Sequence, residues 1–327
     1  MAEKRTGPTR VEVALRTAQR LQRRLPSPAA ALRATEFPLR APTVPGGVEP
    51  LPAAKTLGAA YETSWARSPA ARLGRMAIQE GAMRPLVKVL ADPERRGYDR
   101  MAGLDGPAIF AANHLSHIDA GLLLTSLPEP WRRRAFAGAA ADYFFDTRVK
   151  ATMAALALNA IPIERAKVGR RSAALAAELI EDGWSMVIFP EGGRSPDGWA
   201  QPFRAGAAFL SVRTGVPVVP VHLEGTGRIL PKGTSKLVRG STRVTFGTPL
   251  RPGPDEDMRD LSVRIEAAVG ALADEVSGDW YAARRRAHAG DSPSLTGPDA
   301  SAWRRAWALC DRRSHRRRRR EPWPLRD

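Results

Sequence analysis

The sequence predicts an α/β fold in which a mostly parallel sheet is flanked by helices, with N-terminal amphipathic helices and basic termini. Short apolar runs alternate with helical patterns over residues 104–250, the order typical of parallel strands joined by crossover helices. The run Pro107–Ala112 follows a glycine and is apolar throughout, as expected of a strand buried on both faces. The aliphatic content of the 327 residues is sufficient for a sizeable core.

The first 60 residues predict a basic, partly disordered N-terminal extension. The stretch from Pro26 to Pro52 is rich in Pro, Gly and Ala and is interpreted as an extended linker. Before it, Val11–Leu25 places apolar residues at helical spacing with arginines between them. A short solvated or docking helix and a membrane-bound helix both fit this segment, and the former is slightly favoured.

A second amphipathic pattern runs from Ala70 to Leu90. Pro85 is expected to break it into two helices, because proline lacks the N–H that an interior helical position donates. The apolar face of these helices can cover the sheet, or it can lie in the headgroup layer of a membrane.

The central part of the chain has a regular series of patterns. Apolar runs predict strands near 107–112, 134–138, 160–163, 185–189, 217–222 and 242–246. Helical periodicity predicts helices near 118–126, 147–158, 168–182, 204–214 and 257–276. Residues 284–320 are basic, with a helix predicted at 300–311 and a disordered arginine run at 316–320.

Polar residues directly follow the first predicted strand. His114 and Asp119 are spaced so that the carboxylate falls about one helical turn beyond the imidazole and can bond its second nitrogen. Ligands bind at the carboxyl edge of open α/β sheets, so this pair is a candidate general base with its orienting partner. His117 competes for the role, but on a helix it points to a different face from Asp119. Asn113 and Ser116 can also cap the helix that follows.

The run Asn113-His114-x-Ser116-x-x-Asp119 resembles the first signature block of the glycerolipid acyltransferase family, whose best-known members are lysophosphatidic acid acyltransferases. Three further blocks follow in the family's order. They are NAIPIER at Asn159–Arg165, FPEGGRS at Phe189–Ser195 and VPVVPV at Val216–Val221. Four ordered matches are far more specific than one.

The resemblance implies an acyltransferase domain at residues 61–280, with its motif core at 104–250. His114, oriented by Asp119, would take the proton from a lysophospholipid hydroxyl as that oxygen attacks an acyl thioester. The expected acceptor is 1-acylglycerol-3-phosphate, the donor is acyl-CoA or acyl-carrier protein, and no cofactor is expected. The substrate-binding residues that the blocks imply are Asn113, Ser116, Arg165, Glu191, Gly192, Gly193, Arg194 and Ser195.

Among these residues, the resemblance implies that Arg165 binds the phosphate of the acceptor. It also implies that Glu191 and Arg194 help to hold the acceptor or its phosphate. The fourth block is expected to line the acyl site. Two positions depart from the family pattern: Asn159 stands where the family often has glycine, and residues 139–141 are alanines where many relatives carry a lysine. The acceptor can therefore be a lysolipid with another headgroup.

The net charge of +17 lies entirely in the flanks. Residues 1–100 carry 18 basic and 9 acidic residues, residues 281–327 carry 13 and 5, and residues 101–280 carry 20 of each. Residues 281–327 are therefore predicted to form a basic C-terminal extension. We expect an anionic membrane as a partner, with a cytoplasmic protein held peripherally on the inner face of the cell membrane. No apolar run is long enough for a bilayer span or a signal peptide.

Two other classes of function stay open at this point. An acyl hydrolase would use the same histidine and aspartate on water. A nucleic-acid-binding protein fits the arginine run, but the basic residues lie outside the core without interleaved aromatics, so nucleic acid is not an expected partner. The sequence has no Gly-x-Ser-x-Gly nucleophile motif, and its five histidines and single cysteine, Cys310, predict neither a metal site nor a disulfide within the chain.

Overall fold

The computed structural model describes residue 58 and residues 60–164, 170–231 and 234–297. The predicted helices at 11–25 and 300–311, the linker, the arginine run and Arg165 lie outside these residues. Within them, no helix combines the length and the apolar character needed to cross a bilayer.

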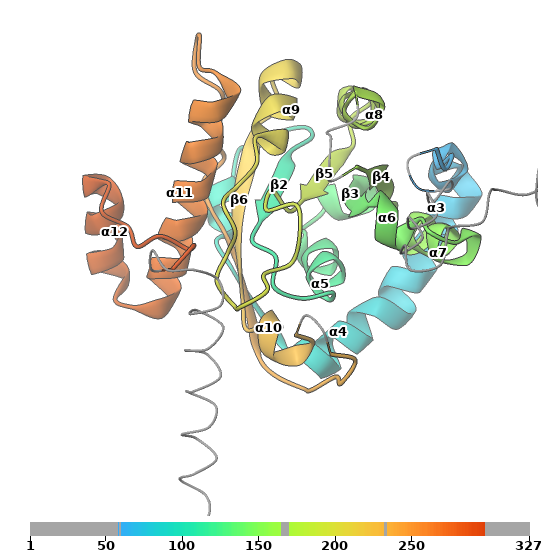
Figure 1. Ribbon diagram of the computed structural model, residues 1–327, viewed down its shortest axis with the longest axis horizontal. Helices are drawn as coiled ribbons and strands as arrows, with labels where there is room; N and C mark the ends of the chain where they lie inside the picture. The colour runs from blue at the N-terminus through green and yellow to red at the C-terminus, as the bar shows by residue number, and fades with distance from the viewer. Residues whose placement is uncertain (1–57, 59, 165–169, 232–233, 298–327) are drawn as a thin grey trace, which may run out of the picture. The chain divides into compact units, whose positions relative to one another are not determined.

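Seven strands of the described chain form one sheet in the order β1-β7-β6-β2-β5-β3-β4 (Figure 1). All neighbouring pairs are parallel except β6 and β7, which are antiparallel. This mostly parallel sheet confirms the predicted fold class. The strands are β1 Pro93–Arg96, β2 Ile109–Ala112, β3 Ala135–Ala140, β4 Ile161–Ile163, β5 Ser185–Ile188, β6 Val218–Glu224 and β7 Thr242–Phe246.

Helices cover both faces of the sheet (Figure 1). Successive residues of β2 enter the two cores alternately: Phe110 packs with α4 and α5, while Ile109 packs with α8, α9 and α11. Because both faces of the strand are covered, neither set of alternate positions has to be polar. The covering helices are α4 Arg84–Ala91, α5 Asp119–Ser126, α8 Arg170–Glu181, α9 Gly206–Thr214 and α11 Met258–Ser277.

The amphipathic pattern at 70–90 forms one continuous helical path. The helix α3 (Pro69–Ile78) passes through a π-helical turn, η2 (Gln79–Met83), directly into α4. The N–H of Arg84 bonds the carbonyl of Gln79, five residues back. Pro85 lies in the first turn of α4, next to this wider turn, so no regular helical hydrogen bond is required of it. The two predicted helices are present as α3 and α4, but the helical path between them widens before the proline instead of ending.

This N-terminal helical segment holds the end of α7 (Arg148–Leu158). Nε of Arg75 donates to the carbonyl of Leu156 over 2.9 Å, and Nε2 of Gln79 donates to the carbonyl of Ala157 over 3.0 Å. The last carbonyls of a helix have no partner within it, and a cation there also complements the helix dipole. Burial, with two nearby arginines, lowers the pKa of Arg75 to about 10, so its guanidinium stays charged at neutral pH.

Two elements carry no clear signal in the sequence. The strand β1 lies at the sheet edge, and three of its four residues are exposed and charged, so it has no apolar alternation to recognise. The helix α12 (Trp280–Ala289) packs against α11. The remaining short helices are η1 Ser64–Arg67, η3 Tyr98–Met101, η4 Trp131–Arg134, α6 Ala141–Phe144 and α10 Thr226–Ile229.

Candidate active site

A cavity opens where four parallel strands end. The carboxyl ends of β2, β3, β4 and β5 meet at one edge of the sheet, and a cavity of about 390 Å³ lies there. Residues of the first three signature blocks share its wall. The lining residues are His114, His117, Ala120, Ala137, Gly138, Ala139, Ala140, Tyr143, Phe144, Leu158, Ile163, Glu164, Ile188, Phe189, Pro190, Gly192, Gly193, Arg194, Arg204 and Gly206.

His114 and Asp119 form the predicted pair. Nδ1 of His114 lies 2.8 Å from Oδ2 of Asp119, whose side chain is fully buried. The same carboxylate oxygen accepts the N–H groups of Leu115 over 2.7 Å and Ser116 over 2.8 Å, which fixes its position. The imidazole stacks on Phe189 with ring centres 4.2 Å apart. A carboxylate at Nδ1 keeps the proton on that nitrogen, so Nε2 is the nitrogen able to accept a proton.

His117 lines the same cavity but has different neighbours. Its ring stacks on Tyr143, whose hydroxyl lies 3.2 Å from Nε2, and it meets the edge of Phe144. Burial, and then the nearby charge of Arg194, lowers the pKa of His117. The carboxylate of Asp119 is hydrogen-bonded to His114, so the geometry favours His114 as the base.

Glu191 is almost completely buried, with 2% of its surface exposed. Its Oε1 accepts the N–H of His114 over 2.7 Å, and its Oε2 accepts the N–H of Gln201 over 2.9 Å. Burial raises the pKa of this carboxyl to about 7, although both backbone donors act in the opposite direction. Glu191 therefore joins the loop after β2 to the loop after β5, and its part in holding the acceptor stays a prediction.

The glycine turn after β5 is shaped by its neighbours. Gly192 has φ of 71°, and an added Cβ would lie 3.0 Å from Nε of Arg204, so glycine suits both the backbone angle and the space. Gly193 and Arg194 line the cavity. The N–H of Ser195 donates to the carbonyl of His114 over 2.9 Å, while its hydroxyl accepts the N–H of Gly198 over 2.8 Å. The turn is thus bonded directly to the loop that carries the histidine.

Asn113 and Ser116 bond the backbone of the neighbouring β6–α10 region. Nδ2 of Asn113 donates to the carbonyl of Leu223 over 2.9 Å, and Oδ1 accepts the N–H of Leu223 over 2.7 Å. The hydroxyl of Ser116 donates to the carbonyl of Leu230 over 2.9 Å. The N-cap of α5 is Ile118, which makes no side-chain cap, so the expected capping by Asn113 is not seen. Both side chains hold the histidine loop in place.

The second block reaches the cavity through Ile163 and Glu164, while Arg165 lies outside the described residues. Asn159 ends α7 in a left-handed conformation with φ of 50°, and its Nδ2 donates to the carbonyl of Ala135 over 3.1 Å. Glycine and asparagine are the residues that adopt this conformation most readily, so Asn159 can hold the same left-handed backbone that a glycine would hold at this position.

The fourth block does not line this cavity, and its expected place at the acyl site stays a prediction. Its strand, β6, lies between β2 and β7, and its apolar side chains enter the two cores of the sheet. Pro220 accepts the N–H of Gly247, the residue directly after β7, over 2.8 Å, and because proline has no N–H it returns no bond.

Gln201 is a site residue that the sequence analysis missed. Its Nε2 donates to the carbonyls of Gly193 over 3.1 Å and Arg194 over 3.2 Å. A glutamine in a loop carries no periodic signal, and only its distance to the glycine turn shows the contact. No group of three or more potential metal-ligating side chains occurs among the described residues.

Comparisons with known proteins agree on one family. The acyltransferase family model matches residues 91–224. A chloroplastic 1-acyl-sn-glycerol-3-phosphate acyltransferase of Brassica napus is 32% identical over 158 residues, which cover 47% of this chain and 44% of that protein. An enzyme of the same name from Pseudomonas aeruginosa is 32% identical over 103 residues, which cover 31% of this chain and 39% of the relative. The chain thus spans less than half the length of these curated relatives.

The fold also matches a solved structure. The crystal structure of the 1-acyl-sn-glycerophosphate acyltransferase PlsC from Thermotoga maritima superposes with a TM-score of 0.51 and 24% identity, covering 64% of this chain and 82% of that one. At this identity the likeness concerns the fold alone. The family match falls on the segment that carries the first three blocks, the His114–Asp119 pair and most of the cavity wall, so it is this segment of the chain that is similar to the acyltransferase family.

Proposed function

We propose that this chain is an O-acyltransferase that moves a fatty acyl group from an acyl thioester to a hydroxyl of a lysophospholipid. The expected acceptor is 1-acylglycerol-3-phosphate, which would give phosphatidic acid. The observation that carries the proposal is the bond between His114 and the buried Asp119 at the wall of a cavity, within a domain of the acyltransferase family.

In the proposed reaction, Nε2 of His114 takes the proton of the acceptor hydroxyl as that oxygen attacks the thioester carbonyl carbon. The tetrahedral intermediate then expels the thiolate, which takes the proton back from Nε2, and the new ester leaves. Asp119 holds the other nitrogen and stabilises the imidazolium between the two transfers. No covalent enzyme intermediate is needed.

The oxyanion of the intermediate needs a hydrogen-bond donor. Gly193 lines the cavity, and its N–H donates to no acceptor within the part of the chain that the structure describes. A backbone amide fixed in advance stabilises developing charge without reorganising. We therefore assign this N–H to the oxyanion.

The cavity wall has a basic part and an apolar part. Arg194 and Arg204 supply positive charge beside the glycine turn, which suits the phosphate of the acceptor. Arg165 remains the predicted phosphate ligand from the second block. Residues 137–140, with Leu158 and Ile163, give an apolar wall that suits hydrocarbon. The alanines at 139–140 leave this wall without the lysine that many relatives carry.

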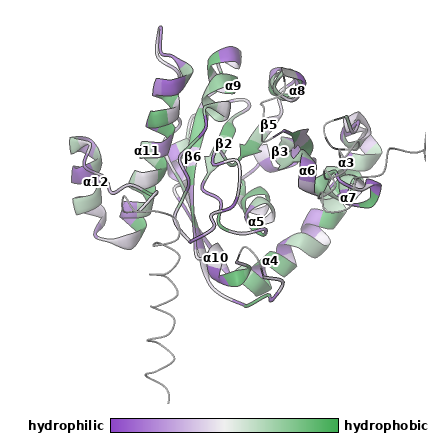
Figure 2. Cartoon of the chain, in the orientation of Figure 1, coloured by the Kyte–Doolittle hydropathy of each residue, from purple (hydrophilic) through white to green (hydrophobic). Residues whose placement is uncertain are grey.

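We also propose a peripheral attachment to the cytoplasmic face of an anionic membrane. Several apolar side chains of the N-terminal helical segment and of α7 are exposed, among them Leu73 at 64% and Val149 at 74%. Figure 2 shows apolar and polar stretches alternating along α4. Arginines and lysines accompany them on the same helices, a composition that suits a headgroup layer.

The test is an assay panel with labelled acyl-CoA and acyl-carrier protein as donors. Each donor is offered to lysophosphatidic acid, to glycerol phosphate and to lyso-aminolipids, and once without acceptor. Esterified product with lysophosphatidic acid supports the proposal and identifies the donor. Transfer only to another lysolipid would show that this lysolipid, and not lysophosphatidic acid, is the acceptor. Rapid acyl release without acceptor supports the hydrolase alternative.

A further inference from the structure

Gln201 makes three hydrogen bonds around the glycine turn. Its side-chain amide donates to the carbonyls of Gly193 and Arg194, over 3.1 Å and 3.2 Å. Its backbone N–H donates to Oε2 of Glu191 over 2.9 Å. One residue therefore contacts both the wall of the cavity and the carboxylate that holds the backbone of His114.

These bonds fix the direction of two peptide groups. In a planar trans peptide the carbonyl and the N–H point in opposite directions, so each carbonyl bonded to Gln201 directs its partner N–H away from Gln201. The partner N–H groups are those of Arg194 and Ser195, and the second donates to the carbonyl of His114 over 2.9 Å. The Gln201 amide thus sets both the placement of Arg194 and the link from the turn to the histidine loop.

The turn that carries Gln201 is held from outside by residues 291–297, here called the C-terminal strap. The N–H of Ala200 donates to the carbonyl of Leu295 over 3.1 Å. Gly297 lies so close to the indole of Trp199 that an added Cβ would come within 2.4 Å of a ring carbon. At the other end of the turn, Oε2 of Glu266 accepts the N–H of Phe203 over 2.9 Å.

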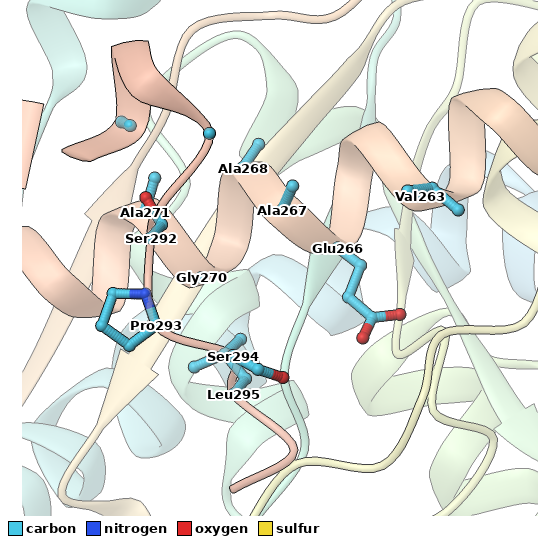
Figure 3. Close-up of a pocket in the computed structure, with 12 residues that line it drawn as sticks. Val263, Glu266, Ala267, Ala268, Gly270, Ala271, Ser292, Pro293, Ser294 and Leu295 are labelled. Atoms are coloured by element: carbon cyan, nitrogen blue, oxygen red, sulfur yellow. The ribbon is translucent and has the colours of Figure 1, made fainter.

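The strap also runs beside α11. Figure 3 shows Ser292–Leu295 along the α11 residues Val263–Ala271, and a cavity of about 500 Å³ is lined by both segments. The strap therefore leaves open space against α11, while at Trp199 it is in close contact.

We infer that Gln201 is a positioning residue that holds the Gly193–Arg194 wall for the acceptor, and that the C-terminal strap clamps the turn that carries it. This inference rests on the proposed function for its kinetic part. The clamp itself can be measured without substrate, so the two can fail separately.

The kinetic test compares Gln201→Met with Gln79→Met in the full chain. Both changes keep the side-chain volume and remove amide bonds to backbone carbonyls, but Gln79 bonds the end of α7. Gln201→Met is expected to raise the KM for the acceptor about 10-fold or more and leave the donor KM unchanged, because the acceptor's charged partner is displaced. Gln79→Met is expected to lower the Tm with both KM values unchanged. A loss of kcat alone in Gln201→Met, with neither KM changed, would overturn the positioning role.

The clamp is tested by hydrogen–deuterium exchange of residues 191–201. Gly297→Val places a side chain against Trp199 and is expected to speed exchange at Ala200 and Gln201, while a chain ended after Gly297 exchanges like the full chain. Trp199→Leu removes the ring from the contact and is expected to speed exchange in the same way. This second variant tests the clamp if Gly297→Val fails to fold. Unchanged exchange in folded Gly297→Val or Trp199→Leu refutes the clamp. Inactivity of the unmodified chain would refute the proposed function, and the exchange result would still decide the clamp.

Discussion

Oε1 of Glu191 accepts the backbone N–H of His114 over 2.7 Å, across a separation of 77 residues in the sequence. The other oxygen bonds the N–H of Gln201. The resemblance predicts that this carboxylate helps to hold the acceptor, but in the structure both of its oxygens accept backbone N–H groups of the protein itself. The Glu191 carboxylate thereby fixes the loop that carries His114 against the glycine turn. Because the carboxylate is buried there, its pKa differs from that of an exposed glutamate.

Replacing Glu191 by Gln is expected to change how stability depends on pH. Burial raises the pKa of Glu191 to about 7 from an ordinary value of 4.5, so the folded state binds this proton more tightly than the unfolded state. The stabilisation of the folded state by this proton is complete below pH 4.5 and is lost as the pH rises through 7. The free energy of unfolding of the unmodified protein, minus that of Glu191→Gln, should fall over this range by at most about 3 kcal/mol. Urea denaturation at a series of pH values measures it, and a rising difference contradicts it.

His114→Ala is expected to abolish acyl transfer with the fold intact. Loss of a general base typically costs about 10²–10⁴-fold in rate. His117→Ala should cost far less, because His117 contacts Tyr143 and the carboxylate of Asp119 is bonded to His114. Steady-state rates, with circular dichroism as the control for folding, measure both. Equal losses in the two variants would remove the reason for assigning the base to His114.

Arg165→Ala is expected to raise the KM for a phosphate-bearing acceptor with little change in kcat. A guanidinium that grips the phosphate equally in the ground state and the transition state contributes uniform binding. An acceptor without phosphate should not respond to the change. Arg213→Ala, on the exposed side of α9, is the matched control. If Arg165→Ala unfolds the protein, the residue is structural and the acceptor assignment loses this support.

Deleting residues 1–60 together with 312–327 is expected to release much of the protein from anionic vesicles. The flanks carry the excess charge, and each basic residue near an anionic surface contributes up to about 1 kcal/mol. Activity on detergent-dispersed substrate should stay largely intact, because the four signature blocks lie outside both deleted segments. Flotation of both proteins at low and high salt measures the effect.

Equal flotation of both proteins, insensitive to salt, would reject this electrostatic account. The attachment would then be assigned to the exposed apolar side chains of α3 and α7. Leu73→Glu and Val149→Glu, in the full chain, would test that assignment, because each places a charge where an exposed apolar side chain now stands.

The sequence by itself determined the elements whose signals are local. The strand β2 is apolar at every position because both its faces are covered, and His114 and Asp119 are five residues apart, so one turn of chain brings them together. The left-handed end of α7 at Asn159 is also local, since asparagine tolerates that conformation. The order of the four blocks was enough to indicate the family.

Tertiary structure decided the rest, because it depends on partners far apart in the chain. Glu191 bonds one backbone group 77 residues away, and Asn113 bonds backbone groups 110 residues away. Every residue except proline has the same backbone N–H and C=O groups, so the sequence does not indicate which of them a side chain will bond. The edge strand β1 is charged, and only its pairing with β7 makes it a strand. The role of Gln201 follows from three distances that no spacing encodes. Local periodicity records which face is buried, and it does not record which group lies opposite.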